Sequence, residues 1–279
     1  MFREELEKIL TNGVFYAAIV SAVILLMLGY IYKSPYTGEE HTVLGMMFND
    51  DREALIKEAD LHATDVILGG IDSYLEMFVP VIVVIPFAII VCGERKNSNT
   101  RFEIYRLGKT RYIMGKYLAD MVSGGLIVMS GYMVFSLMIS LLLPGGTGIV
   151  AEYQNQYLAD NSFVAGALMK GFGYKGLYML KFLRMFVYGA VSVIPAFGIS
   201  MITRNRYVII SIPFLFNYLL EKFIIKQENV NLIYVMNKTC GNIYATDIKR
   251  MAIVFGAEIL LIGVFCRVYL GRKCDCGGE

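Results

Sequence analysis

The sequence predicts an all-helical integral membrane protein, and three observations support this prediction. Hydrophobic residues make up 56% of the 279 residues and charged residues only 18%, too few to cover the surface of a water-soluble domain. Long apolar runs recur along the whole chain. A dense basic segment, residues 93–117, lies between two of these runs.

Six apolar runs are predicted to span a membrane, for which a helix needs about 20 mostly apolar residues. They lie at about 14–32, 77–92, 118–143, 179–202, 208–223 and 251–270. Prolines interrupt three of the runs, at Pro80 and Pro86, at Pro195 and at Pro213. Because neighbouring helices or cavity water satisfy the carbonyl that a proline frees, these positions indicate either ordinary kinks or the hinges of a moving pathway.

The basic segment sets the orientation that we expect. It carries seven bases against two acids, and the bases are Arg95, Lys96, Arg101, Arg106, Lys109, Arg111 and Lys116. Short loops rich in Lys and Arg stay on the cytosolic side of a membrane. With an even number of spans, both termini then lie on the cytosolic side, and we expect the first span to be retained rather than cleaved as a signal peptide.

Two further helices are predicted outside the spans. In residues 1–13 the apolar residues fall on one helical face and the charged residues on the other, which is typical of a helix lying along a membrane surface. The apolar face holds Phe2, Leu6, Ile9 and Leu10, and the charged face holds Arg3, Glu4, Glu5, Glu7 and Lys8. Residues 50–68 predict one amphipathic helix on the external side.

Several chemistries are disfavoured by the residues present. His41 and His62 are the only histidines, and Cys274 and Cys276 form a single C-x-C pair, so we expect no metal site and no disulfide framework. Gly108-Lys109-Thr110 is similar to the end of a phosphate-binding loop, but Glu103 stands where that motif needs its first glycine. The net charge of +2 gives no support to nucleic-acid binding, and we expect no catalytic activity.

The order of these features resembles the ABC-2 type permease family, the membrane subunits of a class of ATP-driven exporters. The resemblance is carried by Glu94-Arg95, Thr100, the hydrophobic positions Ile104 and Leu107, the basic position Arg111, and Gly115-Lys116. Asn99 stands where the family usually has glycine, and Gly108-Lys109 replace a frequent proline. The resemblance implies that residues 93–117 are the cytosolic coupling segment, which contacts a separate ATP-binding subunit.

The pattern of this segment suits a docking helix. Apolar anchors, among them Phe102 and Tyr105, alternate with bases such as Arg106 and Arg111, so a short helix here can place rings in a groove whose rim is acidic. The alternative is a basic loop that binds anionic lipid headgroups.

Two charges lie inside predicted spans, Arg184 in the fourth and Glu258 in the sixth, at similar depths. They are predicted to pair across the bundle, either to fix helix register or as part of a substrate contact or gate.

The function that we expect is therefore outward transport of a hydrophobic or amphipathic peptide, drug or lipid-like substrate. The family resemblance implies a dimer with a second copy or a paralogue, no cofactor in this chain, ATP and Mg bound by the partner subunit, and the bacterial cytoplasmic membrane as location. The alternatives are a lipid-binding scaffold or sensor that uses residues 93–117, and an ion-coupled secondary transporter.

Overall fold

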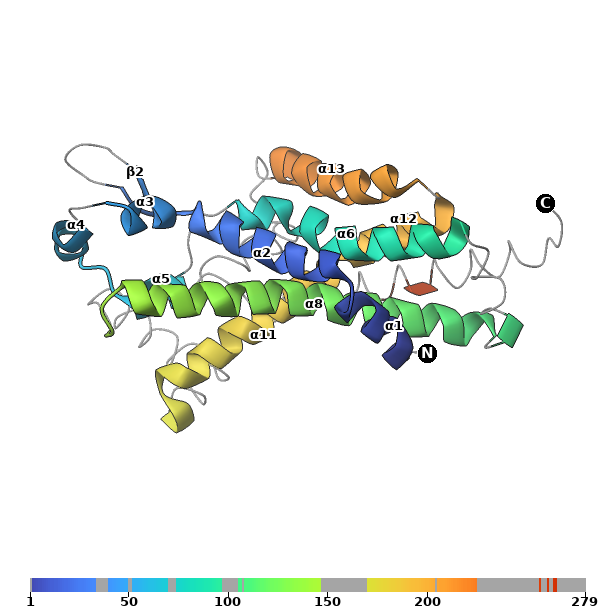
Figure 1. Ribbon diagram of the computed structural model, residues 1–279, viewed down its shortest axis with the longest axis horizontal. Helices are drawn as coiled ribbons and strands as arrows, with labels where there is room; N and C mark the ends of the chain where they lie inside the picture. Colours follow the sequence, from blue (N-terminus) through green and yellow to red (C-terminus); the bar gives the residue numbers. More distant parts are fainter. Residues whose placement is uncertain are drawn as a thin grey trace.

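The computed structural model describes residues 2–33, 40–49, 52–69, 74–96, 105–106, 108–146, 170–203 and 205–224, together with Gly256, Leu260 and residues 263–264. The described part is mostly helical and elongated (Figure 1). Its helices are α1 (Phe2–Leu10), α2 (Gly13–Met27), α3 (Val43–Met47), α4 (Arg52–Glu58), α5 (Ala63–Gly69), α6 (Leu75–Lys96), α8 (Lys109–Leu142), α11 (Tyr174–Ser192), α12 (Ile194–Ile202) and α13 (Arg206–Ile224). The strands β1 (Tyr30–Lys33) and β2 (Glu40–Thr42) form an antiparallel pair.

Within the described residues, three stretches of helix are long and apolar enough to cross a membrane: Met77–Glu94, Arg111–Leu142 and Tyr174–Ile202. A fourth results if α1 and α2, which are bent by 63° relative to each other, count as one broken span. The prediction of a helical protein with membrane-length helices is confirmed in this coarser form, and these helices are compatible with a protein embedded in a membrane. The predicted sixth span, 251–270, lies outside the described residues except for Gly256, Leu260 and residues 263–264.

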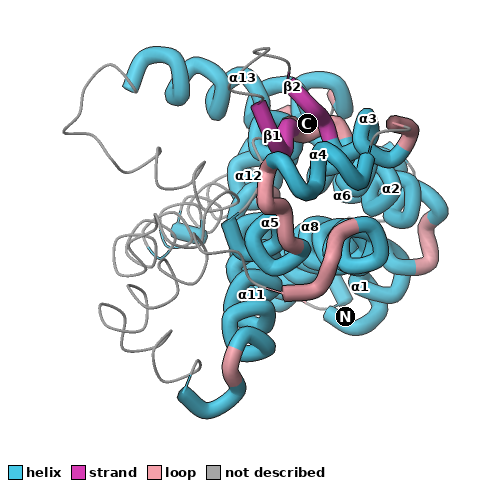
Figure 2. The backbone as a smooth tube through the Cα atoms, turned by 90° about the vertical axis from the view of Figure 1, so that its left-hand side faces the viewer, coloured by secondary structure: helices cyan, strands magenta, loops and turns pink. Residues whose placement is uncertain are grey.

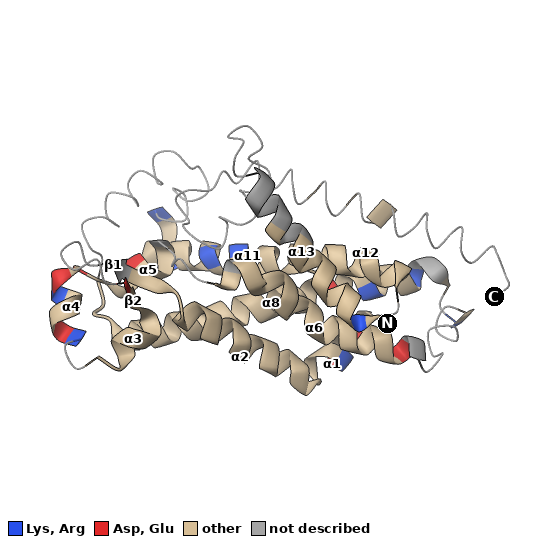
Figure 3. Ribbon diagram, turned by 90° about the horizontal axis from the view of Figure 1, so that it is seen from above, with Lys and Arg blue, Asp and Glu red and all other residues tan. Residues whose placement is uncertain are grey.

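Most charged side chains lie toward the two ends of the long axis, as is expected for a protein that spans a membrane. In Figure 3, Lys, Arg, Asp and Glu of the described helices gather toward the two ends, around α4 and α5 at one and around α1 at the other, with further bases on α11. Large apolar side chains face outward between these ends, among them Val20, Ile24, Leu137 and Leu183. Large apolar side chains exposed in this way are suited to contact with lipid tails.

The long helix α8 forms the centre of the bundle. It packs against α1, α2, α5, α6, α11 and α12, and Figure 2, which looks along the long axis, shows α8 among these helices. Its crossing with α11 is close because glycines meet there, and a Cβ at Gly124 would lie 2.8 Å from Gly189 O. Rings of three helices pack together toward the α1 end, with Phe197 5.2 Å from Tyr117 and 6.0 Å from Phe87 between ring centroids.

Serine hydroxyls inside the helices are satisfied by the preceding turn. Ser136 Oγ donates to Tyr132 O at 2.7 Å, and Ser192 Oγ donates to Tyr188 O at 2.8 Å. Ser21 and Ser211 make the same bond to Ala17 O and Tyr207 O. These bonds allow a hydroxyl to lie in an apolar environment without leaving a buried donor unpaired.

Several predicted boundaries were wrong. The first span was predicted over 14–32, but α2 ends at Met27, because Tyr30 begins strand β1 and pairs with Thr42. The single external helix predicted over 50–68 is two helices, α4 and α5, separated by Asp60, which adopts a left-handed conformation with φ of 46°. An aspartate tolerates this conformation better than most residues, and it ends α4.

The helices that flank the basic segment are longer than predicted. Helix α6 continues to Lys96 rather than ending at 92, and α8 begins at Lys109 rather than at 118. Pro80 and Pro86 lie inside α6, and Pro213 lies inside α13. The fourth predicted span breaks at Val193, and Pro195 lies in the first turn of α12, where its missing N–H costs no helical hydrogen bond.

Helix α5 is fastened to the bundle at the end that also holds α4. Tyr132 of α8 donates its hydroxyl to Ile67 O at 2.6 Å, and Tyr178 of α11 donates to Thr64 Oγ1 at 2.9 Å. Leu68 of α5 is fully buried and packs with Leu177 and Tyr178 of α11. The short helix therefore closes one end of the crossing of α8 and α11.

Candidate functional site

A ring of alternating charges joins three helices at the end of the bundle that holds α1. Lys8 Nζ of α1 lies 2.8 Å from Glu5 Oε1 and 3.2 Å from Glu94 Oε1, at the end of α6. Lys116 of α8 pairs with the same two carboxylates, lying 3.5 Å from Glu5 Oε2 and pairing directly with Glu94 Oε2. Each carboxylate thus meets both lysines, and we call these four residues the charge ring.

The charge ring has a buried side and an exposed side. The side chains of Glu5 and Lys116 are 3% and 4% exposed, and Glu94 is 13% exposed, whereas Lys8 is 45% exposed. Lys116 also donates to Tyr112 Oη at 3.3 Å. Because ions removed from water are stable only when well paired, the inner residues depend on one another, and Lys8 contributes as a screened surface charge.

The bend between α1 and α2 brings Glu5 into the ring. Thr11 N donates to Glu7 O at 2.9 Å to close α1, and the side chain of Asn12 caps α2 by accepting from Val14 N at 3.0 Å. The chain turns by 63° between the two helices, so α1 packs against α8. Glu5 and Ile9, one turn apart, form its buried face.

Glu5 was predicted on the charged face of a helix lying along the membrane surface, and the structure instead buries it between helices. Phe2, predicted on the apolar face, is 40% exposed, while Glu5 is buried because Lys116 lies opposite it. The only sequence signal for the burial of Glu5 was its i, i+4 spacing from Ile9. This spacing does not reveal that Lys116, on a helix far along the chain, is its partner.

The structure brings together two of the residues predicted to couple the chain to an ATPase, Glu94 and Lys116. Arg111, near the start of α8, is exposed, as are Arg106 and Tyr105, whose exposed fraction is 91%. Arg95 lies in the last turn of α6. Thr100, Phe102 and Leu107 lie outside the described residues.

The predicted pair of Arg184 and Glu258 is described only on one side. Arg184 is buried in α11 with 4% exposed, as an intramembrane ion should be, whereas Glu258 lies outside the described residues. One turn before Arg184, Lys181 is fully buried, and its Nζ lies 5.5 Å from the centroid of the Tyr132 ring. Sequence reasoning missed Lys181, although its apolar flanks, YML and FL, gave the same signal as those of Arg184.

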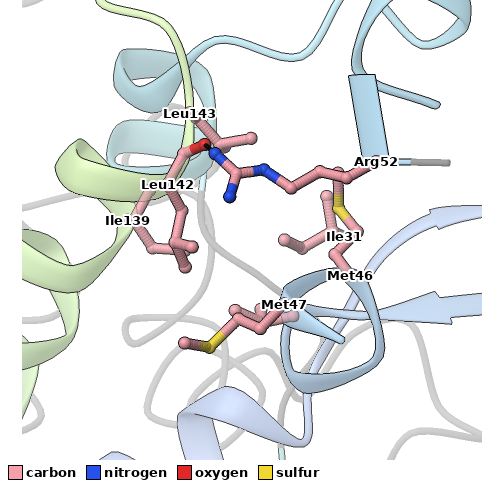
Figure 4. A pocket seen from close by; sticks show the side chains of 8 residues that line it. Ile31, Met46, Met47, Arg52, Ile139, Leu142 and Leu143 are labelled. Carbon is pink, nitrogen blue, oxygen red and sulfur yellow. Dashed lines mark hydrogen bonds between the residues drawn. The ribbon is translucent and has the colours of Figure 1, made fainter. Parts of the chain in front are cut away.

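A small hollow near β1 and α3 is lined by Ile31, Val43, Met46, Met47, Arg52, Ile139, Leu142 and Leu143 (Figure 4). Its cavity volume is about 10 Å³, roughly what one water molecule needs. Arg52 crosses its edge and donates to Leu142 O, so the hollow is a packing feature closed by an arginine.

Metal chemistry finds no support within the described ranges, where no group of three His, Cys, Asp or Glu side chains is placed to hold an ion. Cys92, near the end of α6, is half-buried. The charge ring joins α1, α6 and α8 through paired charges.

No family model, curated protein or solved structure matches this chain. Within the described residues, the basic segment is distinguished by one contact: Glu94 and Lys116, near its two ends, meet in the charge ring.

Proposed function

We propose that this chain is the permease subunit of an ABC-2 type exporter. In this proposal it has six spans, the end that holds α1 faces the cytosol, and both termini lie there. The sequence resemblance described above supports the family, and the membrane-length helices with charges at both ends support the embedded position. The substrate class is hydrophobic or amphipathic.

The observation that carries the proposal is the pairing of Glu94 with Lys116. These residues stand near the two ends of the basic segment, and their pairing holds the end of α6 against the first turns of α8. Tyr105 and Arg106, which lie between them in sequence, are exposed. An exposed aromatic side chain flanked by bases suits docking into a partner protein, with the ring in a groove and the bases against acidic residues at its rim.

The charge ring supports a route for movement from such a partner into the bundle. A displacement of the segment would act on α6 and α8 directly, and on α1 through Glu5 and Lys8. Because breaking one side of a buried ion pair is strongly destabilising, this link opposes separation of the three helices.

The energy source in this proposal is a separate subunit that binds ATP and Mg. The sequence has no complete phosphate-binding loop, since Glu103 occupies its glycine position. The working unit would be a dimer of this chain with a second copy or with a related permease.

Co-purification tests the proposal. Isolated from its native membrane in mild detergent, the chain should bring with it a protein that contains a phosphate-binding loop, and ATP hydrolysis should follow that protein. After the partner is removed, the chain alone should hydrolyse no ATP. Turnover that persists in the chain alone would refute the proposal.

The exposed aromatic provides a sharper test. Tyr105→Ala should leave the protein folded and lower recovery of the ATPase by at least about tenfold, as expected for the loss of more than about 1.4 kcal/mol at an interface anchor. Tyr207→Ala is the matched control, because Tyr207 at the start of α13 is also exposed, at 66%, and also adjoins an arginine. Its loss should leave recovery unchanged.

A lipid-binding scaffold predicts the reverse result. Tyr105→Ala would then matter little, while replacing Arg106 and Arg111 with Ala would weaken binding to anionic liposomes by about 1 kcal/mol for each base. If liposome binding follows the bases and no ATPase is recovered with the parent, the scaffold function replaces the exporter.

A further inference from the structure

Asp120 lies next to the charge ring without belonging to it. It follows Lys116 by one turn on the same face of α8 and is 2% exposed. Its main-chain oxygen accepts a hydrogen bond from Ser123 Oγ at 2.9 Å. Its carboxyl Oδ2 is buried and has no hydrogen-bond partner among the described residues.

The charges around Asp120 balance without it. The charge ring contains two acids, Glu5 and Glu94, and two bases, Lys8 and Lys116. Among the described residues, the charged groups nearest to Asp120 belong to this ring: Lys116 from α8, Glu5 from α1 and Glu94 from α6. An ionised Asp120 would therefore add a buried negative charge to a set that is already neutral.

An ionised carboxylate in such a place is costly. A buried polar atom without a partner loses its hydration and gains nothing in exchange, and a buried charge loses far more, so the group takes up a proton instead. Lys116 cannot neutralise Asp120 at no cost, because its ammonium already serves both ring carboxylates and the Tyr112 hydroxyl.

We propose that Asp120 is a proton-binding site, neutral while the charge ring is closed, and that loss of its proton opens the ring. The proton passes from the carboxyl oxygen to water, and no other bond of the protein breaks. The carboxylate left behind competes for Lys116, so that Glu5 keeps only Lys8 and α1 is held less firmly. This inference goes beyond the transport function and does not depend on it.

The dependence of stability on pH tests this proposal. An unfolded aspartate loses its proton near pH 3.9, so at higher pH unfolding of the protein releases the proton that Asp120 holds. Stability then falls as pH rises, until the folded protein also loses the proton. Relative to Asp120→Asn, the unfolding equilibrium constant of the parent in detergent micelles should rise by up to about tenfold for each pH unit in this window.

Two controls make this result specific. Ser123→Ala, which removes the neighbouring hydroxyl and keeps the carboxyl, should follow the parent curve. Replacement of sodium by choline in the buffer should change nothing for a proton site. Parallel pH curves for the parent and Asp120→Asn, or a stabilisation by sodium that Asp120→Asn abolishes, would overturn the proposal.

A second measurement needs no variant and therefore holds even if Asp120→Asn fails to fold. Dicyclohexylcarbodiimide is apolar and adds to protonated carboxylic acids. In the folded parent at about pH 6, mass spectrometry should find the adduct on Asp120 and on neither Glu5 nor Glu94, and the yield should fall toward about pH 9. Labelling of a ring glutamate with Asp120 untouched would contradict a neutral Asp120.

Discussion

Glu94 in the last turn of α6 pairs with Lys116, which lies about two turns into α8. In the sequence these two residues stand near opposite ends of the basic segment, and both were predicted to belong to the coupling segment. In the structure they are each other's partner, and α1 completes the link through Glu5 and Lys8. The strength of this link can be measured one side chain at a time.

Lys116→Met should destabilise the protein by about 3 kcal/mol or more, since it leaves the buried carboxylate of Glu5 and the partly buried carboxylate of Glu94 with only the exposed Lys8. Lys8→Met should cost less than about 1 kcal/mol, because its charge is screened by water. Unfolding in detergent micelles measures both. Equal losses would show that the ring has no buried side.

The close crossing of α8 and α11 should reject a single methyl group. Gly189→Ala places a Cβ against Gly124 O, a main-chain atom that cannot move aside cheaply, and we expect a loss of about 1 to 3 kcal/mol. The control is Gly93→Ala in α6, where a Cβ meets nothing within 4 Å. That change should be neutral or stabilise by up to about 1 kcal/mol. A harmless Gly189→Ala would mean that the two helices lie further apart.

Pairing of Arg184 with Glu258 stays a prediction. If they meet, Arg184→Ala and Glu258→Ala should each destabilise by about 3 to 5 kcal/mol, and the double variant should recover part of the loss. Additive losses would show that the two residues do not interact. Lys181, which is buried on α11 like Arg184, would then be the next candidate partner for Glu258.

Orientation in the membrane can be tested with two cysteines. Asn49, which follows α3, should lie outside the cell, and Ser98, which lies outside the described residues, should lie inside. In intact cells an impermeant thiol reagent should label Asn49→Cys and spare Ser98→Cys. The reverse pattern would place α1 and the charge ring on the external side and remove the basis for coupling to a cytosolic ATPase.

Local composition was enough to predict the helical, membrane-length character of this protein. Runs such as VPVIVVIPFAIIV can bury their backbone polar groups only as helices in an apolar medium, and this requirement depends on no distant residue. The position of Arg184 was also predictable from the local sequence, and the residue is buried. A charged side chain within an apolar run avoids the lipid by facing the interior of the helix bundle. Residues 93–117 stood out by charge alone.

Tertiary structure decided where the helices end and what their charges meet. Strand β1 shortens the first helix because Tyr30 finds a partner in Thr42, and α8 starts at Lys109, well before its apolar run. Glu5 is buried rather than solvated because the bend after α1 sets it opposite Lys116. Asp120, one turn after that lysine, has no hydrogen-bond partner for its Oδ2 within the part of the chain that the structure describes. Apolarity can be assessed one residue at a time, whereas the energy of a charge depends on the group that packing places within a few ångströms of it.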